Sequence, residues 1–445
     1  MTDPLEIDGA VSPDEAGRDA AAGRPAWRRA LTPNVLRLGL VSFFADVSSE
    51  MLYPLMPLFL TITLGAPATA VGVIEGAAEA VASLLKTVSG RIADRTGRRV
   101  ELVFGGYSLS ALAKPLIALA GSWPLVLVAR LLDRTGKGFR GAPRDAIIAD
   151  STAPEVCGAA FGWHRAMDTL GAVVGPLAAL GMLSLLAGDM RKVILLTVIP
   201  GVIAALLVLT VSDPRRRRRS AAGAAVEGEN GGVGAAACLE AAVPEAGPRR
   251  LRWSAVPGGF RQYLAAWLPF VLVNSSDVFL ILRAKQLGFS TTAVVLVYTL
   301  YNLVYALGSV PLGRLSDRIG RRTVLAGGMV VFAAVYGGFS LATETWQVVA
   351  LFAVYGLYIA ATDGVGKAFA VDLVPRDLRA TSIGLLGTLT GLAALVASSV
   401  AGVLWDAVGP QAPFILGAAG ALVSAGLFAL LPGLRRPPGG RSSER

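Results

Sequence analysis

Residues 90–99 read GRIADRTGRR and residues 313–322 read GRLSDRIGRR, so one charged decapeptide occurs twice, 223 positions apart. Each copy lies between two long apolar runs. Three further pairs follow the same order: Ser48-Ser49-Glu50 with Ser275-Ser276-Asp277, the D-x-x-G-K-x-F segments that begin at Asp133 and Asp363, and the prolines Pro154 and Pro375. Similarity that recurs at a nearly fixed spacing indicates an internal duplication, so we predict two similar halves.

The composition is that of a membrane protein. Hydrophobic residues make up 54% of the chain, the mean hydropathy is +0.60, and only 16% of residues are charged, against roughly 25% in a typical soluble domain. The net charge of +10 comes from arginines in short connectors beside apolar runs, which favours contact with membrane lipids over nucleic acid. One histidine and two cysteines, Cys157 and Cys238, do not suffice for a disulfide framework or a soft-metal site.

Apolar runs long enough to cross a membrane occur twelve times. A helix needs roughly 20 such residues to span about 30 Å of hydrocarbon. The first six runs lie near 34–63, 69–90, 100–120, 124–149, 158–187 and 191–211. The other six lie near 260–284, 290–312, 323–342, 346–370, 379–407 and 411–432. We therefore predict an all-α membrane protein with 12 transmembrane helices.

Arginine placement predicts the orientation. Both decapeptides and the run Arg215–Arg219 fall on one side of the predicted membrane, which the positive-inside rule assigns to the cytoplasm, together with both termini. No positively charged apolar leader is visible near Met1. The predicted division is a disordered tail over 1–33, helical bundles over 34–211 and 259–432, a flexible linker over 212–258 and a second tail over 433–445.

The pattern G-x-x-x-D-R-x-G-R-R between spans two and three resembles the signature loop of the major facilitator superfamily. The weaker second copy lies where that family has one, between spans eight and nine. The resemblance implies two pseudo-symmetric six-helix bundles, action as a monomer, and cytoplasmic gating by Gly90, Asp94, Arg95, Gly97, Arg98, Arg99, Gly313, Asp317, Arg318, Gly320, Arg321 and Arg322. Pro54 to Pro57 and the trio Gly171, Gly175 and Pro176 in span five are similar to motifs of proton-coupled exporters, although Ala179 and Leu180 replace the paired glycines that follow there.

The same fold implies a latch between the halves. It would place Asp94 near the start of span eleven and Asp317 near the start of span five, where a carboxylate accepts hydrogen bonds from unpaired backbone N–H groups. These contacts would form only while the cytoplasmic side is closed. We also expect Arg95, Arg98 or Arg99 to pair with Asp145 or Asp150.

Ionisable residues inside membrane spans are costly and mark functional sites. A carboxyl group that gains and loses a cation as the protein changes state can carry a proton. The candidates for proton coupling are Asp46, Glu50, Glu75, Glu79 and Asp277, with Glu50 first because Asp277 is its counterpart in the repeat. The candidates for the substrate cavity are Lys114, Arg130, Asp133, Arg134, Lys137, Asp168, Asp363 and Lys367.

These features predict a proton-coupled secondary transporter in a bacterial cytoplasmic membrane, working by alternating access and exporting a small organic molecule by antiport. Uptake of an organic anion or zwitterion, with Arg130, Lys114 and Lys137 as anion partners, is the alternative. Export of a divalent metal and a transporter-derived sensor also stay open. We expect no enzyme activity, no cofactor and no resident metal.

Overall fold

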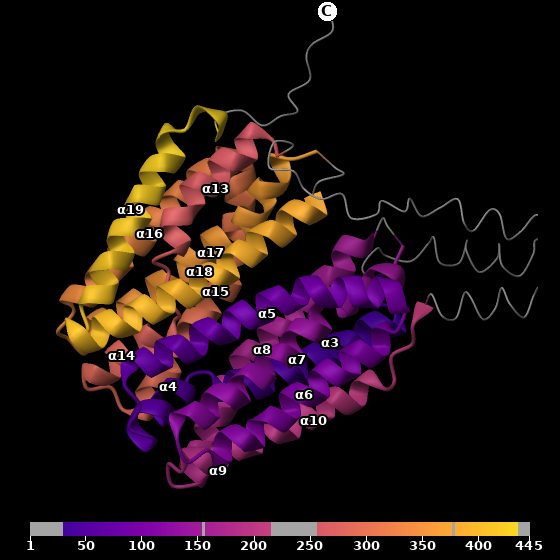
Figure 1. Cartoon of the computed structure of the whole chain (residues 1–445), viewed down its shortest axis with the longest axis horizontal. Coiled ribbons are helices and arrows are strands. Elements are labelled where there is room, and N and C mark those ends of the chain that lie inside the picture. The colour runs from indigo at the N-terminus through magenta and orange to yellow at the C-terminus, as the bar shows by residue number, and fades with distance from the viewer. Residues whose placement is uncertain (1–29, 154–155, 215–255, 376–378, 435–445) are drawn as a thin grey trace, which may run out of the picture.

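In the computed structural model, which describes residues 30–153, 156–214, 256–375 and 379–434, the chain is helical throughout the described part (Figure 1). Nine of the described helices are long and apolar enough to cross a membrane. Most of the predicted tails and linker lies outside the described residues. So do Arg215–Arg219, Cys238 and Pro154.

The first half consists of α3 (Pro33–Leu52), α4 (Met56–Leu58), the π-helical segment η1 (Phe59–Thr63), α5 (Ala68–Thr96), α6 (Arg99–Leu119), α7 (Trp123–Asp150), α8 (Cys157–Leu185), α9 (Met190–Leu196) and α10 (Val198–Val208). The second half consists of α13 (Gly258–Val271), α14 (Val278–Gln286), α15 (Thr291–Ile319), α16 (Arg321–Leu341), α17 (Thr345–Asp372), α18 (Arg379–Ala407), α19 (Ala412–Leu430) and the 3-10 turn η5 (Pro432–Leu434).

Three predicted spans are absent from the nine, each for a physical reason. Helix α3 carries Arg37, Asp46 and Glu50 within 20 residues, and α7 is rich in charge. Span seven is divided into α13 and α14 by a break between Val271 and Val278. Span one is also interrupted, since α3 ends at Leu52 just before Pro54, and proline lacks the N–H that would continue the helix.

The two halves lie side by side and meet along two pairs of helices (Figure 1). Helix α5 packs against α18, and α8 packs against α15. The α5–α18 contact is backbone to backbone, because Gly72 lies against the Ser398 carbonyl and Gly402 against Ala68 and Thr69. A Cβ atom added at Gly402 would lie 2.7 Å from the Ala68 carbonyl oxygen, so glycine permits this approach.

Corresponding contacts define the repeat in the folded chain. Spans three and four match spans nine and ten at an offset of 222 residues. Two pairs of contacts show this, Arg99–Asp150 with Arg321–Asp372 and Gly106–Arg140 with Gly328–Thr362, and so do the ends of α7 and α17. The offset of 230 that aligns the two D-x-x-G-K-x-F segments is therefore wrong for the structure. Asp133 lies 17 residues before the end of α7, whereas Asp363 lies nine residues before the end of α17.

Candidate functional site

A cluster of buried charges joins α5 to α7 in the first half. Arg130 is 1% exposed and donates to both carboxylate oxygens of Glu75, at 3.0 and 3.1 Å, and to Asp133 at 3.0 Å. Arg134 lies 4.0 Å from Glu75. Because two cations face two carboxylates, the cluster is balanced, which a low-dielectric interior requires. Arg130, Glu75 and Asp133 are thus occupied by one another instead of facing a cavity in this conformation.

Lys114 lies in the same core on α6 and is 2% exposed. Its ammonium group donates to the Ser48 hydroxyl on α3, and that hydroxyl donates to the Thr197 carbonyl between α9 and α10. Lys114 therefore connects helices and does not reach the pocket between the halves that is described below.

Asp46 and Lys137 mark a second polar region, which is open to solvent. Lys137 is exposed, yet its electrostatic neighbours Arg134, Asp46 and Glu79 come from α7, α3 and α5. An exposed side chain surrounded by three helices faces a water-accessible space between them. Glu79 is likewise exposed, whereas Asp46 is partly buried beside Asp168 of α8. The Ser42 hydroxyl donates to Asp168 at 2.5 Å.

Glu50 lies at the boundary between the halves. Its carboxylate accepts a hydrogen bond from the Tyr298 hydroxyl of α15 at 2.6 Å, and the rings of Tyr53 and Tyr298 lie 5.4 Å apart. The predicted counterpart of Glu50, Asp277, is held differently. It accepts hydrogen bonds from Tyr355 at 2.6 Å and Tyr301 at 3.1 Å, both within the second half.

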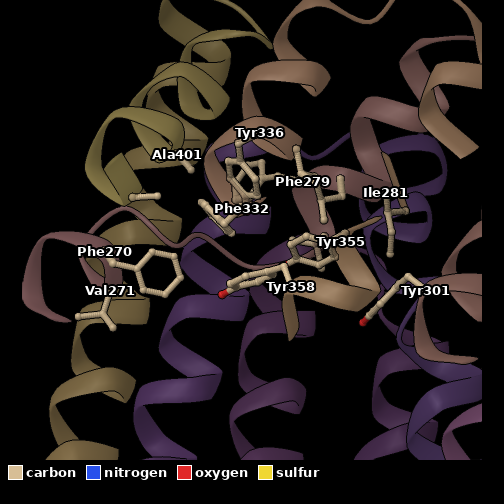
Figure 2. Packing of buried hydrophobic residues seen from close by; sticks show 14 of the residues in the cluster. Phe270, Val271, Phe279, Ile281, Tyr301, Phe332, Tyr336, Tyr355, Tyr358 and Ala401 are labelled. Atoms are coloured by element: carbon tan, nitrogen blue, oxygen red, sulfur yellow. The ribbon is translucent and has the colours of Figure 1, made fainter. Parts of the chain in front are cut away.

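The core of the second half contains a cluster of aromatic side chains (Figure 2), whereas the cluster of buried charges lies on α5 and α7 of the first half. Phe332 stacks on Tyr336 with ring centroids 3.9 Å apart, and Tyr358 and Tyr355 pack around them. Edge-to-face and offset contacts of this kind stabilise a core beyond the area that they bury.

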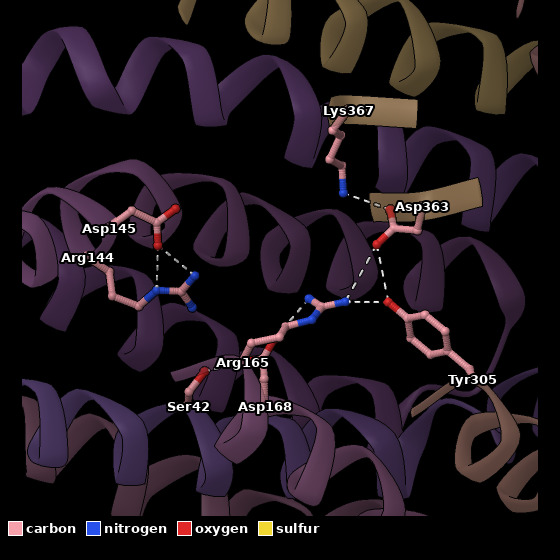
Figure 3. A network of polar contacts seen from close by, with 8 residues as sticks. All are labelled: Ser42, Arg144, Asp145, Arg165, Asp168, Tyr305, Asp363 and Lys367. Atoms are coloured by element: carbon pink, nitrogen blue, oxygen red, sulfur yellow. Dashed lines mark hydrogen bonds and ion pairs between the residues drawn. The ribbon is translucent and has the colours of Figure 1, made fainter. Parts of the chain in front are cut away.

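Arg165 of α8 connects the halves through a polar network (Figure 3). It contacts Asp168 at 3.4 Å within its own half, and the Tyr305 hydroxyl at 2.5 Å and Asp363 at 3.6 Å across the boundary. Asp363 also accepts from Tyr305 at 3.2 Å and from Lys367 at 2.7 Å. A pocket of about 440 Å³ surrounds these groups, lined by Arg165, Tyr305, Asp363, Lys367, Asp317 and Arg321 among others.

The molecule is closed at the end opposite the decapeptides. There Asp406 of α18 accepts hydrogen bonds from the backbone N–H groups of Ala68 at 3.1 Å and Thr69 at 2.7 Å, at the first turn of α5. Tyr53 and Ser276 contact each other at 3.4 Å beside it. The 440 Å³ pocket, in contrast, is lined by Gly313, Ser316 and Asp317 of the second decapeptide region, so it lies toward the decapeptide end.

One arginine anchors each decapeptide, Arg99 fully buried and Arg321 partly buried. Arg99 is 3% exposed and pairs with Asp150 at 2.5 Å, which confirms one of the two predicted partners, whereas Asp145 pairs with Arg144. Arg321 pairs with Asp372 at 2.7 Å.

The acidic members of the decapeptides face solvent. Asp94 is 71% and Asp317 is 65% exposed, and their ion pairs are with Arg99 and Arg321 of their own decapeptides. Arg95, Arg98 and Arg318 are exposed, and Arg322 donates to the carbonyls of Phe428 and Ala429. In this open arrangement the predicted latch is not formed among the described residues.

Glycines at the two glycine positions of the decapeptides have distinct roles. Gly97 and Gly320 have positive φ angles of 66° and 93° and end α5 and α15, a conformation that glycine adopts without strain. Gly90 packs on Ala142, whereas Gly313 has open space around it. In span five, Gly171 and Gly175 pack on the backbone of α3 and Pro176 lies inside α8. The exporter-type motif thus lies at a close contact within the first half.

Metal binding finds no support in the described part of the chain, where no group of three His, Cys, Asp or Glu side chains is arranged to hold an ion. His164 is buried on α8, and its Nε2 atom has no hydrogen-bond partner.

Comparison with known proteins agrees with the two-halved architecture. The family model described as Major Facilitator Superfamily matches residues 38–282 and 262–445. The chain belongs to this superfamily of membrane transporters. An uncharacterized MFS-type transporter of Methanocaldococcus jannaschii is 33% identical over 402 residues, which cover 89% of this chain and 94% of the relative.

Other similarities are more distant. The class C tetracycline resistance protein of Escherichia coli is 34% identical over 119 residues, 27% of this chain and 30% of that protein. The structure of the nucleoside transporter NupG superposes with a TM-score of 0.68 at 14% identity, over 89% of this chain and 98% of that one. The human organic anion transporter MFSD10 superposes with a TM-score of 0.60 at 17% identity, over 91% and 100%. At such identities the solved structures show the fold alone.

Two features of the site were not predicted from the sequence, the tyrosines of α15 and the cap on α5. Tyr298, Tyr301 and Tyr305 are spaced by three and four residues on α15, a spacing that places them on one helix face. That pattern was visible in the sequence. Asp406 gave no comparable signal, because its partners are backbone groups 337 and 338 residues away.

Proposed function

We propose that this major facilitator superfamily transporter exports a small organic solute in exchange for protons. The halves 34–211 and 259–432 act as the two moving units, and the decapeptide side faces the cytoplasm, as the arginine distribution favours. The structure then corresponds to the state that is open to the cytoplasm. Alternation of the open side moves the solute across the membrane.

The hydrogen bond between Glu50 and Tyr298 carries the proposal. Its donor and acceptor belong to different halves and lie 2.6 Å apart. When the halves separate at this level, Glu50 loses its donor and meets water. A carboxyl group whose solvation and partners alternate between two states is able to bind a proton in one and release it in the other.

Asp46 is the second proposed proton carrier. It lies beside Asp168 and within electrostatic range of Lys137, next to a water-accessible space. Glu75 fits a different role, because both of its oxygens are engaged by Arg130 within a single half. We assign Glu75 to the clamp between α5 and α7.

Export is favoured over uptake by two partial similarities. The span-five trio Gly171, Gly175 and Pro176 is similar to an exporter motif, and stretches of the chain match a tetracycline resistance protein and the multidrug resistance protein MdtH of Photorhabdus laumondii, the latter at 31% identity over 133 residues. The names of these relatives support the proposed direction.

The test is transport in proteoliposomes under an imposed pH gradient, with a panel of organic anions, cations and neutral compounds. We expect Glu50→Gln to abolish gradient-driven accumulation of the transported compound while leaving exchange of that compound across the membrane. The control is Asp189→Asn, because Asp189 caps α9 at the closed end, and asparagine caps equally well. Unchanged gradient-driven transport in the Glu50→Gln protein would exclude this proton site.

Proton-coupled uptake of an organic anion is the second candidate, favoured by the cationic side chains Arg165, Lys367 and Arg321 in the pocket. The two directions give opposite signs in the same experiment. Antiport moves solute against the inward flow of protons, whereas symport moves solute with it.

A further inference from the structure

Arg165 and Lys367 are the two most exposed charged groups of the network that joins the halves. The side chain of Arg165 is 58% exposed inside the pocket, although it contacts Asp168, Tyr305 and Asp363. One edge of the guanidinium faces its own half through Asp168, and the other edge faces the second half (Figure 3). An exposed guanidinium with partners on both sides is poised to exchange one of them.

The contact between Arg165 and Asp363 is the weaker of the two ion pairs that Asp363 makes. Lys367 lies 2.7 Å from Asp363, one helical turn away on α17, whereas Arg165 lies 3.6 Å away. If Arg165 leaves, Asp363 keeps a close cation. The edge of Arg165 would then lack its carboxylate partner, so the exchange requires an anion and no cation.

We infer that Arg165, Tyr305 and Lys367 form the binding site for the carboxylate group of a small organic anion, which replaces Asp363 as the partner of Arg165. This inference rests on the proposed transport function and names its substrate class. A guanidinium edge binds a carboxylate through two parallel hydrogen bonds, and the Tyr305 hydroxyl lies 2.5 Å from the same edge.

The charge and size of the pocket agree with this class. Three cations line it, Arg165, Arg321 and Lys367, against the two carboxylates Asp317 and Asp363. Arg321 is held by Asp372 and Lys367 by Asp363, each at 2.7 Å. Arg165 is therefore the least tightly paired of the three cations and offers its edge to the ligand, and Lys367 adds positive charge nearby. A volume of about 440 Å³ accommodates a small molecule with an apolar body. An organic cation would meet Arg165 and Lys367 and is disfavoured.

The placement of the site also links binding to movement. Arg165 belongs to α8 of the first half, and Tyr305 and Lys367 belong to α15 and α17 of the second. A carboxylate held by both sides draws the halves together at the decapeptide end, which favours closure there. Ligand binding then selects the state that opens on the other side.

The experiment measures ligand-induced thermal stabilisation of the purified full-length protein in detergent. The probes are monocarboxylates of increasing size, from acetate through benzoate to naphthoate, with the amide and the alkylammonium analogue of each. We expect stabilisation by one or more carboxylates and by none of the matched amides or ammonium compounds. Arg165→Gln is expected to weaken the apparent affinity by about tenfold to a hundredfold, since a hydrogen-bonded charge is lost, and Arg165→Lys by less.

Arg314→Gln is the matched control, because Arg314 is an exposed residue of the second decapeptide on α15 and does not line the pocket. It is expected to bind like the wild type. The melting temperature of each variant without ligand shows whether it folds. Stabilisation by ammonium compounds, by no carboxylate, or equally in the Arg165→Gln protein would overturn the inference.

Failure of the site and failure of the proposed function give different results. If carboxylates do not bind but another solute accumulates under a pH gradient, the anion site is wrong and the proton-coupled function stands. If carboxylates bind through Arg165 but a pH gradient drives no movement, the site stands and proton coupling is wrong.

Discussion

The two halves share a backbone plan but hold it together with different chemistry. At equivalent positions on the helices, the first half has Glu75, Lys114, Arg130 and Asp133, whereas the second has Tyr298, Tyr336, Phe352 and Tyr355. The first set lies in a buried group of charges and the second in a cluster of aromatic rings that pack edge-on or tilted. Duplication thus preserved the helix positions while the interactions between them diverged.

The difference predicts how each half responds to substitution. A buried ion pair is sensitive to the loss of one partner, because the other charge stays in a low-dielectric interior. An aromatic core loses area and a hydrogen bond but no compensating charge. We therefore expect single charge changes to destabilise the first half strongly, and conservative substitutions to destabilise the second half less.

The largest effect is expected for Glu75→Gln. The change leaves Arg130, which is 1% exposed, with Asp133 as its remaining carboxylate at 3.0 Å. We expect a loss of about 3–5 kcal/mol in the free energy of unfolding, measured by denaturant unfolding in detergent. Glu79→Gln, one turn away and exposed, should stay within about 0.5 kcal/mol. Equal losses of stability in the two variants would contradict the role of Glu75 as a clamp between α5 and α7.

A smaller effect is expected in the second half for Tyr355→Phe and Tyr301→Phe. Each removes one donor from Asp277, which we expect to cost about 1–3 kcal/mol in the same unfolding experiment. Tyr263→Phe is the control, because the Tyr263 hydroxyl donates at 3.1 Å to the neutral Gly366 carbonyl, and such bonds are about half as strong. If all three variants lose the same stability, the charge of Asp277 has no part in holding the tyrosines.

The halves also differ in how the second helix of each is capped. Helix α15 is capped by its own Ser290, which accepts from Ala293 N–H at 3.1 Å. Helix α5 begins after Pro67, which has no capping side chain, and it is capped by Asp406 of the other half. We expect Asp406→Ala to remove about 1 kcal/mol from this state and to shift the populations about fivefold toward the opposite one.

Distances between spin labels on the two halves at the closed end would report this shift. Asp406→Asn keeps an acceptor and should shift the populations less. Ser290→Ala should lower the stability of α15 and leave the populations unchanged. The assignment fails if Ser290→Ala and Asp406→Ala move the distance distribution alike.

The smallest effect on stability is expected for Asp94→Asn and Asp317→Asn. Both side chains are exposed, at 71% and 65%, and their ion pairs with Arg99 and Arg321 are 3.3 and 3.4 Å long. Exposed pairs contribute about 0–1 kcal/mol, so unfolding should change little and equally in the two variants. The latch hypothesis adds that transport slows in both. Normal transport rates in both variants would contradict the latch and leave the decapeptides with only the role of setting the membrane orientation.

The fold was predictable because it follows from apolar run length and arginine placement. Helix α18 spans the predicted residues 379–407, and the predicted pair Arg99–Asp150 is present. The ion pairs inside the bundle were harder to predict from the sequence. Glu75 and Arg130 are 55 residues apart in the chain, and a single sequence does not give the rotation of one helix against another that brings them together.

Similar residue types also predicted a wrong correspondence between the halves where the position along the helix was ignored. The segments that begin at Asp133 and Asp363 look alike, but one lies in the ionic core and the other in the pocket between the halves. Conversely, Lys114 and Tyr336 have nothing in common as residues and occupy corresponding places. Contacts to neighbouring helices identify equivalence more reliably than residue type does.

The seam between α5 and α18 has a mechanical consequence. At Gly72 and Gly402 no side chains separate the two helices, so main chain lies directly against main chain and has little room to compress. Sliding of α5 along α18 would drive the Ser398 carbonyl into Gly72. The seam therefore resists shear between the halves, and any side chain added at Gly72 would force the two helices apart.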